Sequence, residues 1–526
     1  MTPVGTLRLV LILLAAAVAL VLAARKLRVP EAIAFVVGGM VLALIPSAPH
    51  VALDPDLTMV LFLPPLLLAG GFTTHVREFR RHLSPILLLA VGAVAFTTLA
   101  VGATLKLLVP DLPWAACFTF GAIVSPTDAV AALAIMRQIR LPRRIITILE
   151  GESLVNDASG LVLYRMAVAA TLTGTFDAAG ASLSFIWLVV AGIATGAVLG
   201  YAFSFGVRVL RDTHLEIAAT FLIAWGGYIL AEAAGGSGVL ATVTSGLMMG
   251  WMQHDIASPR TRVAAAATWD FVLFVLHALV FILIGLSLNG VLNRLGELPS
   301  PHLAWLGVAV SLAVIASRFV WVYPLIYLRA LISRPPGPLA APNVPFVISW
   351  SGMRGVVSLA VALALPVEMP GRDMILFLTF CVILATLVVQ GLTLRPLLAW
   401  LQFAPEKAQE TGLFSQALVQ ARLAAASLRY IEERAADPLD GAMAKDLLTE
   451  FRDQASWTSR ADDDGAAGRA EKSARATLRL GALAAAREAL LRMHHRREIH
   501  EETLRTIEGD MDLEEVRLRR MLGGGD

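Results

Sequence analysis

Long apolar segments separated by short polar loops make up the first 401 residues. A helix needs about 17 to 25 mostly apolar residues to cross a bilayer. Thirteen segments reach or approach that length, at residues 6–24, 31–46, 57–72, 83–108, 113–136, 144–172, 183–207, 214–233, 236–252, 268–291, 302–330, 343–366 and 373–400. The pattern predicts an all-α polytopic membrane protein with about 13 transmembrane helices.

Basic residues in the loops give an orientation, because Lys and Arg collect on the cytoplasmic side of a membrane protein. Loops after odd-numbered segments carry 16 of them, whereas loops after even-numbered segments carry only Arg294 and Arg372. This alternation places the amino terminus outside and the carboxyl-terminal tail in the cytoplasm.

Two of the predicted spans contain helix-breaking residues near mid-membrane. Pro126 interrupts the fifth span, because proline lacks an amide donor and clashes with the preceding turn. Gly352 and Gly355 flank Arg354 in the twelfth span. Breaks at corresponding positions of two halves indicate a transporter site. They lie seven spans apart, and an odd shift reverses orientation, as inverted repeats require.

The composition changes after residue 401. Hydrophobic residues form 57% of the chain and charged residues 16%, yet 19 of the 43 Lys and Arg and 23 of the 41 Asp and Glu lie from Gln402 onward. We therefore predict a membrane domain at 1–401 and a cytoplasmic, helical, regulatory tail at 402–526, with helices at 413–434 and from about 469 to 521. The two cysteines, Cys117 and Cys381, lie in apolar segments and indicate neither a disulfide framework nor a metal site.

The sixth span carries an unusual row of polar side chains. Ser153, Asn156 and Asp157 share one face of a helix, with Glu152 at its edge. An ionisable residue inside a membrane is expensive to bury and therefore indicates function. A buried Asp157 can hold either a proton or a cation but not both, which is antiport in its simplest form. The alternative is that Asp157 pairs with Arg165.

The broken fifth span offers further oxygen ligands, which hard cations prefer. Thr127 and Asp128 follow Pro126, so that Thr127, Asp128, Ser153 and Asp157 form a candidate site for a monovalent cation. The same segment also reads as a helix start, with Ser125 as N-cap and Pro126 at the first helical position.

Arg354 cannot remain unpaired in hydrocarbon because its guanidinium is always charged. Glu152 is its expected partner, with Glu150 as the alternative. This ion pair would hold the sixth and twelfth spans together.

Three motifs together resemble a known family. They are the 125–130 segment Ser-Pro-Thr-Asp-Ala-Val, the 152–157 segment Glu-Ser-Leu-Val-Asn-Asp, and the 352–355 segment Gly-Met-Arg-Gly. In this order and in these spans they resemble bacterial sodium/proton exchangers of the monovalent cation:proton antiporter family, which includes the eukaryotic sodium/proton exchangers.

The resemblance implies a homodimer in which a mobile unit with two broken, crossing helices carries the ion by alternating access. It implies that Asp157 binds the ion and the proton, and that Asn156, Ser153, Thr127 and Asp128 complete the ligand set. It also implies a Glu152–Arg354 ion pair, and electroneutral exchange from an Asn-Asp rather than an Asp-Asp pair.

One position departs from the family pattern. Many bacterial members end the third-span motif with a glutamate that reaches the ion site, whereas Ala69 stands here after the 64–68 segment Pro-Pro-Leu-Leu-Leu. Potassium transport is therefore an alternative to sodium transport.

These observations predict an antiporter of the bacterial inner membrane that exchanges Na⁺, or alternatively Li⁺ or K⁺, for H⁺ and serves pH and salt homeostasis. No cofactor and no nucleic-acid partner are expected. A cation channel or a transporter-derived sensor signalling through the tail is the rival. An enzyme is the weakest alternative, because no histidine lies near Ser153 in the sequence.

Overall fold

The computed structural model describes residues 3–27, 29–44, 55–136, 141–174, 178–294, 301–332, 343–401, 416–435, 447–449, 452, 465–496 and 501–522. Every regular element within these ranges is helical. The chain divides into two compact units, Met1–Pro405 and Glu406–Asp526. We call them the membrane unit and the tail unit.

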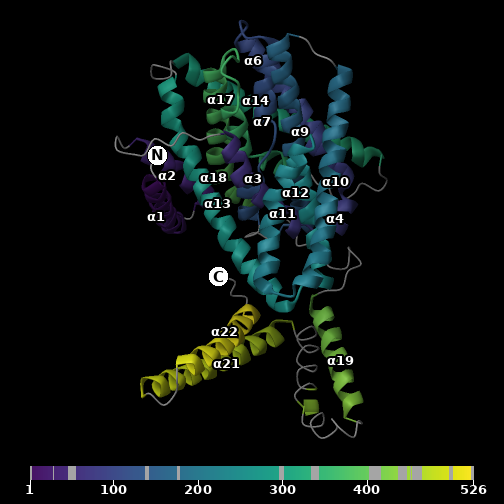
Figure 1. Cartoon of the computed structure of the whole chain (residues 1–526), viewed down its shortest axis with the longest axis vertical. Coiled ribbons are helices and arrows are strands. Elements are labelled where there is room, and N and C mark those ends of the chain that lie inside the picture. Colours follow the sequence, from purple (N-terminus) through teal and green to yellow (C-terminus); the bar gives the residue numbers. More distant parts are fainter. Residues whose placement is uncertain are drawn as a thin grey trace. The chain divides into compact units, whose positions relative to one another are not determined.

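Each predicted apolar segment contains one helix or a short series of helices, which form a bundle in the membrane unit (Figure 1). The elements are α1 (Pro3–Leu27), α2 (Glu31–Ala43), α3 (Pro55–Thr73), α4 (Val76–Arg81), α5 (Leu83–Leu87), η1 (Leu88–Ala93), α6 (Val94–Leu108), α7 (Trp114–Val124), α8 (Val130–Met136), α9 (Arg143–Thr173), α10 (Ala178–Leu210), α11 (Thr213–Ala233), α12 (Gly238–Ile256), α13 (Pro259–Arg294), α14 (Pro301–Ile332), α15 (Asn343–Trp350), α16 (Val356–Leu363), α17 (Arg372–Ala385), η3 (Thr386–Gln390) and α18 (Gly391–Leu401).

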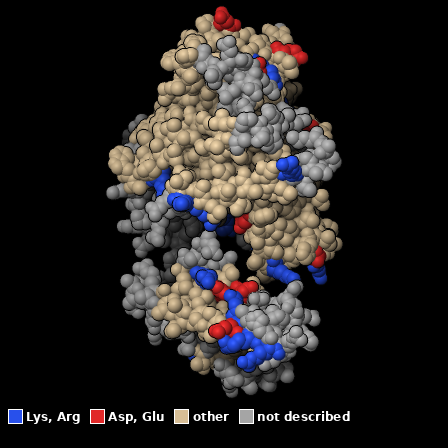
Figure 2. Space-filling model, turned by 90° about the vertical axis from the view of Figure 1, so that its left-hand side faces the viewer, with Lys and Arg blue, Asp and Glu red and all other residues tan. Residues whose placement is uncertain are grey.

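Length and apolar composition agree with a membrane protein. Among the described residues, 7 helices or continuous helix series are long and apolar enough to cross a bilayer. Large apolar side chains point outward along them; on α10, for example, Trp187 is 59% exposed and Phe205 68%. Figure 2 shows a broad uncharged surface on the membrane unit. The all-helical membrane fold is confirmed, while the total of 13 spans stays a prediction.

Both predicted interruptions are present. α7 ends at Val124 and α8 begins at Val130, while α15 ends at Trp350 and α16 begins at Val356. The two breaks meet, because the Asp128 backbone N–H donates a 2.8 Å hydrogen bond to the Met353 carbonyl.

The predicted helix cap at the first break is wrong. The Ser125 hydroxyl donates to the Ala122 carbonyl of the preceding helix at 3.0 Å, and α8 starts five residues after Ser125. Ser125 therefore ends α7 and does not begin α8. The backbone from Ser125 to Ala129 is left outside any helix and is available for contacts with the second break.

Glycines bring several helix backbones into direct contact. A Cβ atom added at Gly39 of α2 would lie 3.0 Å from the Gly285 Cα of α13. A Cβ atom at Gly71 of α3 would lie 2.8 Å from the Val243 carbonyl oxygen of α12. We call these two contacts the glycine seams, since no side chain separates the backbones there.

The tail unit is helical in its described part, with α19 (Gln416–Arg434), α21 (Gly465–His495) and α22 (Glu501–Met521). The single helix predicted from about 469 to 521 is therefore two helices. Arg487 of α21 joins them through ion pairs with Asp512 at 2.5 Å and Glu515 at 2.6 Å.

Candidate ion-binding site

A cavity of about 420 Å³ lies between α3, α9, α13, α16 and the first break. Its size allows several water molecules or a hydrated cation, given a volume of about 30 Å³ for each liquid water. The polar residues in its lining are Thr58, Thr73, Asp128, Glu150, Ser153, Asp157, Asp270, His277 and Ser358.

Asp157 faces this cavity and is 8% exposed. Among the described hydrogen bonds and ion pairs, none involves its carboxylate. Arg165, the alternative partner considered from the sequence, instead pairs with Glu232 of α11 at 3.0 Å. The Asp157 carboxylate is therefore available to a proton or a cation that enters the cavity.

Two other predicted site residues lie in the same lining. The Ser153 hydroxyl, one turn before Asp157 on α9, accepts a 3.3 Å hydrogen bond from the Ala129 backbone N–H. Asp128 lies directly against Gly355 of the second break, because a Cβ atom at Gly355 would collide with its carboxylate. The structure thus brings Asp128, Ser153 and Asp157 to one cavity.

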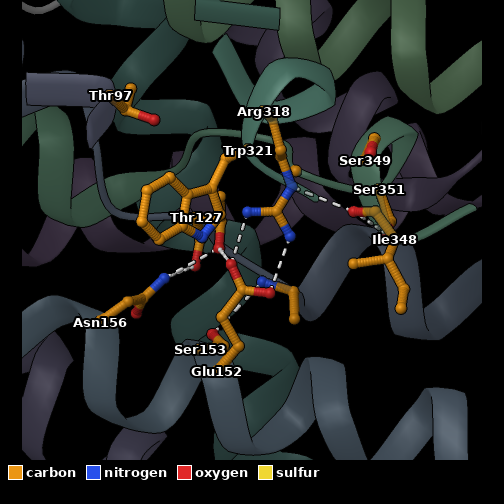
Figure 3. A network of polar contacts seen from close by, with 12 residues as sticks. Thr97, Thr127, Glu152, Ser153, Asn156, Arg318, Trp321, Ile348, Ser349 and Ser351 are labelled. Atoms are coloured by element: carbon orange, nitrogen blue, oxygen red, sulfur yellow. Dashed lines mark hydrogen bonds and ion pairs between the residues drawn. The ribbon is translucent and has the colours of Figure 1, made fainter. Parts of the chain in front are cut away.

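Thr127 and Asn156 lie behind that lining, in a buried network (Figure 3). The Asn156 amide donates to the Thr127 carbonyl and hydroxyl oxygens, both at 2.8 Å. The Thr127 hydroxyl donates to Glu152 Oε1 at 2.9 Å. These contacts attach the first break to α9 and thereby fix the position of Asp128.

The predicted ion pair between Glu152 and Arg354 is wrong, because Glu152 pairs with Arg318 of α14. Arg318 Nη1 and Nη2 reach the two Glu152 carboxylate oxygens at 2.5 and 2.7 Å, and both side chains are buried. This bidentate geometry suits the planar guanidinium. The sequence places Arg318 inside an apolar span, where a buried arginine needs a hydrogen-bonding partner, but 166 residues separate it from Glu152.

Arg354 is buried as well, and it binds backbone carbonyls. Its Nε donates to the Val124 carbonyl at 2.6 Å, and its Nη1 donates to the Gly352 carbonyl at 2.8 Å. Arg318 Nε likewise donates to the Ile348 carbonyl at 3.0 Å. Val124 and Ile348 lie in the last turns of α7 and α15, so each broken helix has an arginine at its carboxyl end, where a cation is favoured.

Ala69 also lines the cavity. The position at which the resembling proteins carry a glutamate therefore faces the cavity. Its methyl group provides neither a ligand nor a charge there.

The contact between Gly355 and Asp128 makes a testable prediction. We expect Gly355→Ala to lower cation/proton exchange at least about tenfold, because the added methyl group must displace the Asp128 carboxylate from its place at the cavity; displacements of about 1 Å at a reacting site cost up to a hundredfold. Transport by purified protein in liposomes measures this. Gly206→Ala on α10 is the matched control, since nothing lies within 4 Å of its added Cβ. Equal activity of the two variants would contradict the prediction.

The sequence and fold match known transporters. Residues 11–400 match the family model described as sodium/hydrogen exchanger, transmembrane. The chain belongs to this sodium/hydrogen exchanger family. The resemblance inferred from the three motifs is thereby confirmed, and the membrane unit of this family member corresponds to the matched region.

Individual relatives extend the comparison. The family member is 34% identical over 69% of its length to a sodium, potassium, lithium and rubidium/H⁺ antiporter of Bacillus pumilus, and the match spans 56% of that protein. It is 32% identical over 89% of its length to an uncharacterized Na⁺/H⁺ exchanger of Escherichia coli K12, YjcE, spanning 90% of that protein.

A solved structure shows the same fold. The sodium proton antiporter MjNhaP1 of Methanocaldococcus jannaschii matches 74% of this chain and 100% of its own, with a TM-score of 0.58 and 19% identity. The tail unit lies beyond the region that the family model matches.

Proposed function

We propose that this chain exchanges a monovalent cation for protons across the bacterial inner membrane. The observation that carries the proposal is the Asp157 carboxylate, which faces a cavity lined in part by polar residues and has no described cationic partner. A proton and a cation compete for such a group, so loading one releases the other. The names of the relatives, which are Na⁺/H⁺ antiporters or exchangers, support the same activity.

The proposed ligands are Asp157, Asp128 and Ser153, all in the cavity lining. Thr127 and Asn156 were predicted as ligands too, but their described hydrogen bonds support a positioning role behind the site. Within the described residues, no group of three His, Cys, Asp or Glu is arranged to hold a metal ion. A weakly bound monovalent ion held by a few oxygens fits this arrangement, since transport requires release.

Na⁺ is the proposed cargo, with Li⁺ or K⁺ as alternatives. Two observations support K⁺. Ala69 stands in the cavity lining where a carboxylate would raise the field strength of the site. The name of the Bacillus pumilus relative includes potassium among its cations. We propose further that the exchange is electroneutral, that the protein is a homodimer working by alternating access, and that the amino terminus lies outside with the tail in the cytoplasm.

Proton movement in proteoliposomes tests the proposal. We expect Na⁺ added outside liposomes with an acidic interior to drive proton efflux. Measuring this in a potassium-free buffer distinguishes Na⁺/H⁺ exchange from K⁺/H⁺ exchange. Efflux that continues with no added cation would indicate a channel or a leak and would contradict antiport. K⁺-driven efflux at an equal or higher rate would assign the activity to K⁺/H⁺ exchange.

A further inference from the structure

α13 contributes a stripe of side chains to the ion cavity. Asp270, Leu273, His277 and Phe281 all line it, and their spacings of three and four residues place them on one helix face. Asp157 of α9 lines the same cavity. The charge state of the stripe therefore acts on whatever ion occupies the cavity.

Of the two nitrogens of the His277 ring, one is hydrogen-bonded and the other has no partner among the described residues. Its side chain makes a hydrogen bond with the Leu273 backbone, and its Nε2 is buried without a partner among the described residues. Nδ1 therefore donates to the Leu273 carbonyl, and in the neutral ring Nε2 carries a lone pair. A proton on Nε2 makes the ring a cation.

His277 becomes positively charged when it is protonated, whereas the other titratable groups in the described lining of the cavity are carboxylates. Asp157 and Glu150 come from α9, Asp128 from the first break, and Asp270 from α13 itself. The lining contributions of α3 and α16 include hydroxyls but no titratable side chain. A protonated His277 is thus the one positive side chain in a lining with four carboxylates.

We propose that His277 is a second proton-binding group of the ion cavity, whose protonated form opposes the transported cation. This inference rests on the proposed exchange function. A proton on His277 and a cation near Asp157 are like charges within one cavity, so each weakens binding of the other. Acid pH then displaces the cation through His277 as well as through the carboxylate ligands Asp157 and Asp128.

The pH dependence of the apparent KM for Na⁺ tests this. Displacement of one proton raises the apparent KM by at most tenfold per pH unit, whereas displacement of two raises it by up to about a hundredfold. We expect the wild-type protein to exceed tenfold per unit on the acid side. His277→Gln should show a smaller rise per pH unit than the wild-type protein, with exchange at alkaline pH retained. His302→Gln is the matched control, because His302 is exposed at the start of α14.

His277→Lys provides the opposite change, a charge that persists across the pH range. We expect it to raise the apparent KM for Na⁺ about 5- to 150-fold, the usual range of coupling between two bound ligands. Each variant is first checked for a monodisperse peak in size-exclusion chromatography.

Identical slopes in wild-type and His277→Gln protein would overturn the inference, as would an unchanged KM in His277→Lys. Loss of exchange at alkaline pH in well-folded His277→Gln would also overturn it, since the neutral ring would then be required for transport. None of these results affects the proposed function, which fails only if the wild-type protein does not couple cation and proton movement.

Discussion

Asp157→Asn is expected to abolish exchange while leaving the protein folded. Asparagine has nearly the same shape, but it carries no charge for the cation and takes up no proton at neutral pH. Removing one member of a close charge pair costs about 2 to 5 kcal/mol or more, which corresponds to at least about a thirtyfold loss of cation binding. Cation-driven proton flux and direct Na⁺ binding to the purified protein both measure this.

Asp111→Asn is the matched control for this experiment. It makes the same chemical change at an exposed position in the loop after α6, and we expect wild-type exchange. Exchange by well-folded Asp157→Asn protein at more than about a tenth of the wild-type rate would contradict the assignment, and Asp128→Asn would then identify the next candidate.

Arg318→Met should have the largest effect on stability. It leaves Glu152 buried without its guanidinium and also leaves the Ile348 carbonyl without its Arg318 donor. Breaking a buried ion pair by removing one partner costs about 3 to 5 kcal/mol. The loss is measured by thermal unfolding of the detergent-purified protein, as a lower midpoint temperature.

Arg165→Met provides the comparison for an ion pair near the surface. Arg165 and Glu232 are 48% and 28% exposed, and such pairs contribute less than about 1 kcal/mol. Adding Glu152→Gln to Arg318→Met should recover part of the lost stability, because it removes the stranded charge. Equal destabilisation by Arg318→Met and Arg165→Met would contradict a special role for the buried pair.

The positions of the helix breaks were predictable because they depend on local chemistry. Pro126 removes a backbone donor, and Gly352 and Gly355 weaken the helix around Arg354, whatever the rest of the chain does. The structure places non-helical backbone at both sites. The polar face of α9 was equally predictable, since the helical repeat alone aligns Ser153 with Asp157.

The partners of the buried charges were not predictable in the same way. The packing of the helices decides which of Arg318 and Arg354 meets Glu152. One sequence gives the span of each residue but not its rotation about the helix axis. Backbone carbonyls are a further kind of partner for a buried arginine, and Arg354 binds the Val124 carbonyl at the end of α7.

The distinction between ligands and positioning residues also required the structure. Thr127 and Asp128 are neighbours and both carry oxygen, yet only Asp128 is in the cavity lining. The 125–129 segment is not helical, so its successive side chains point in different directions. The Thr127 side chain therefore contacts Glu152 and Asn156, whereas Asp128 lines the cavity. No periodicity rule applies to such a segment.

The glycine seams determine where the membrane unit is stiff. Helices separated by side chains can slide by rotamer changes, but backbones in direct contact must separate before either can move. α2 and α13 are joined in this way through Gly39 and Gly285, and α3 and α12 through Gly71. We therefore expect each of these two pairs to move as one rigid unit, and the helix movements that open or close the cavity to take place between these pairs and α9.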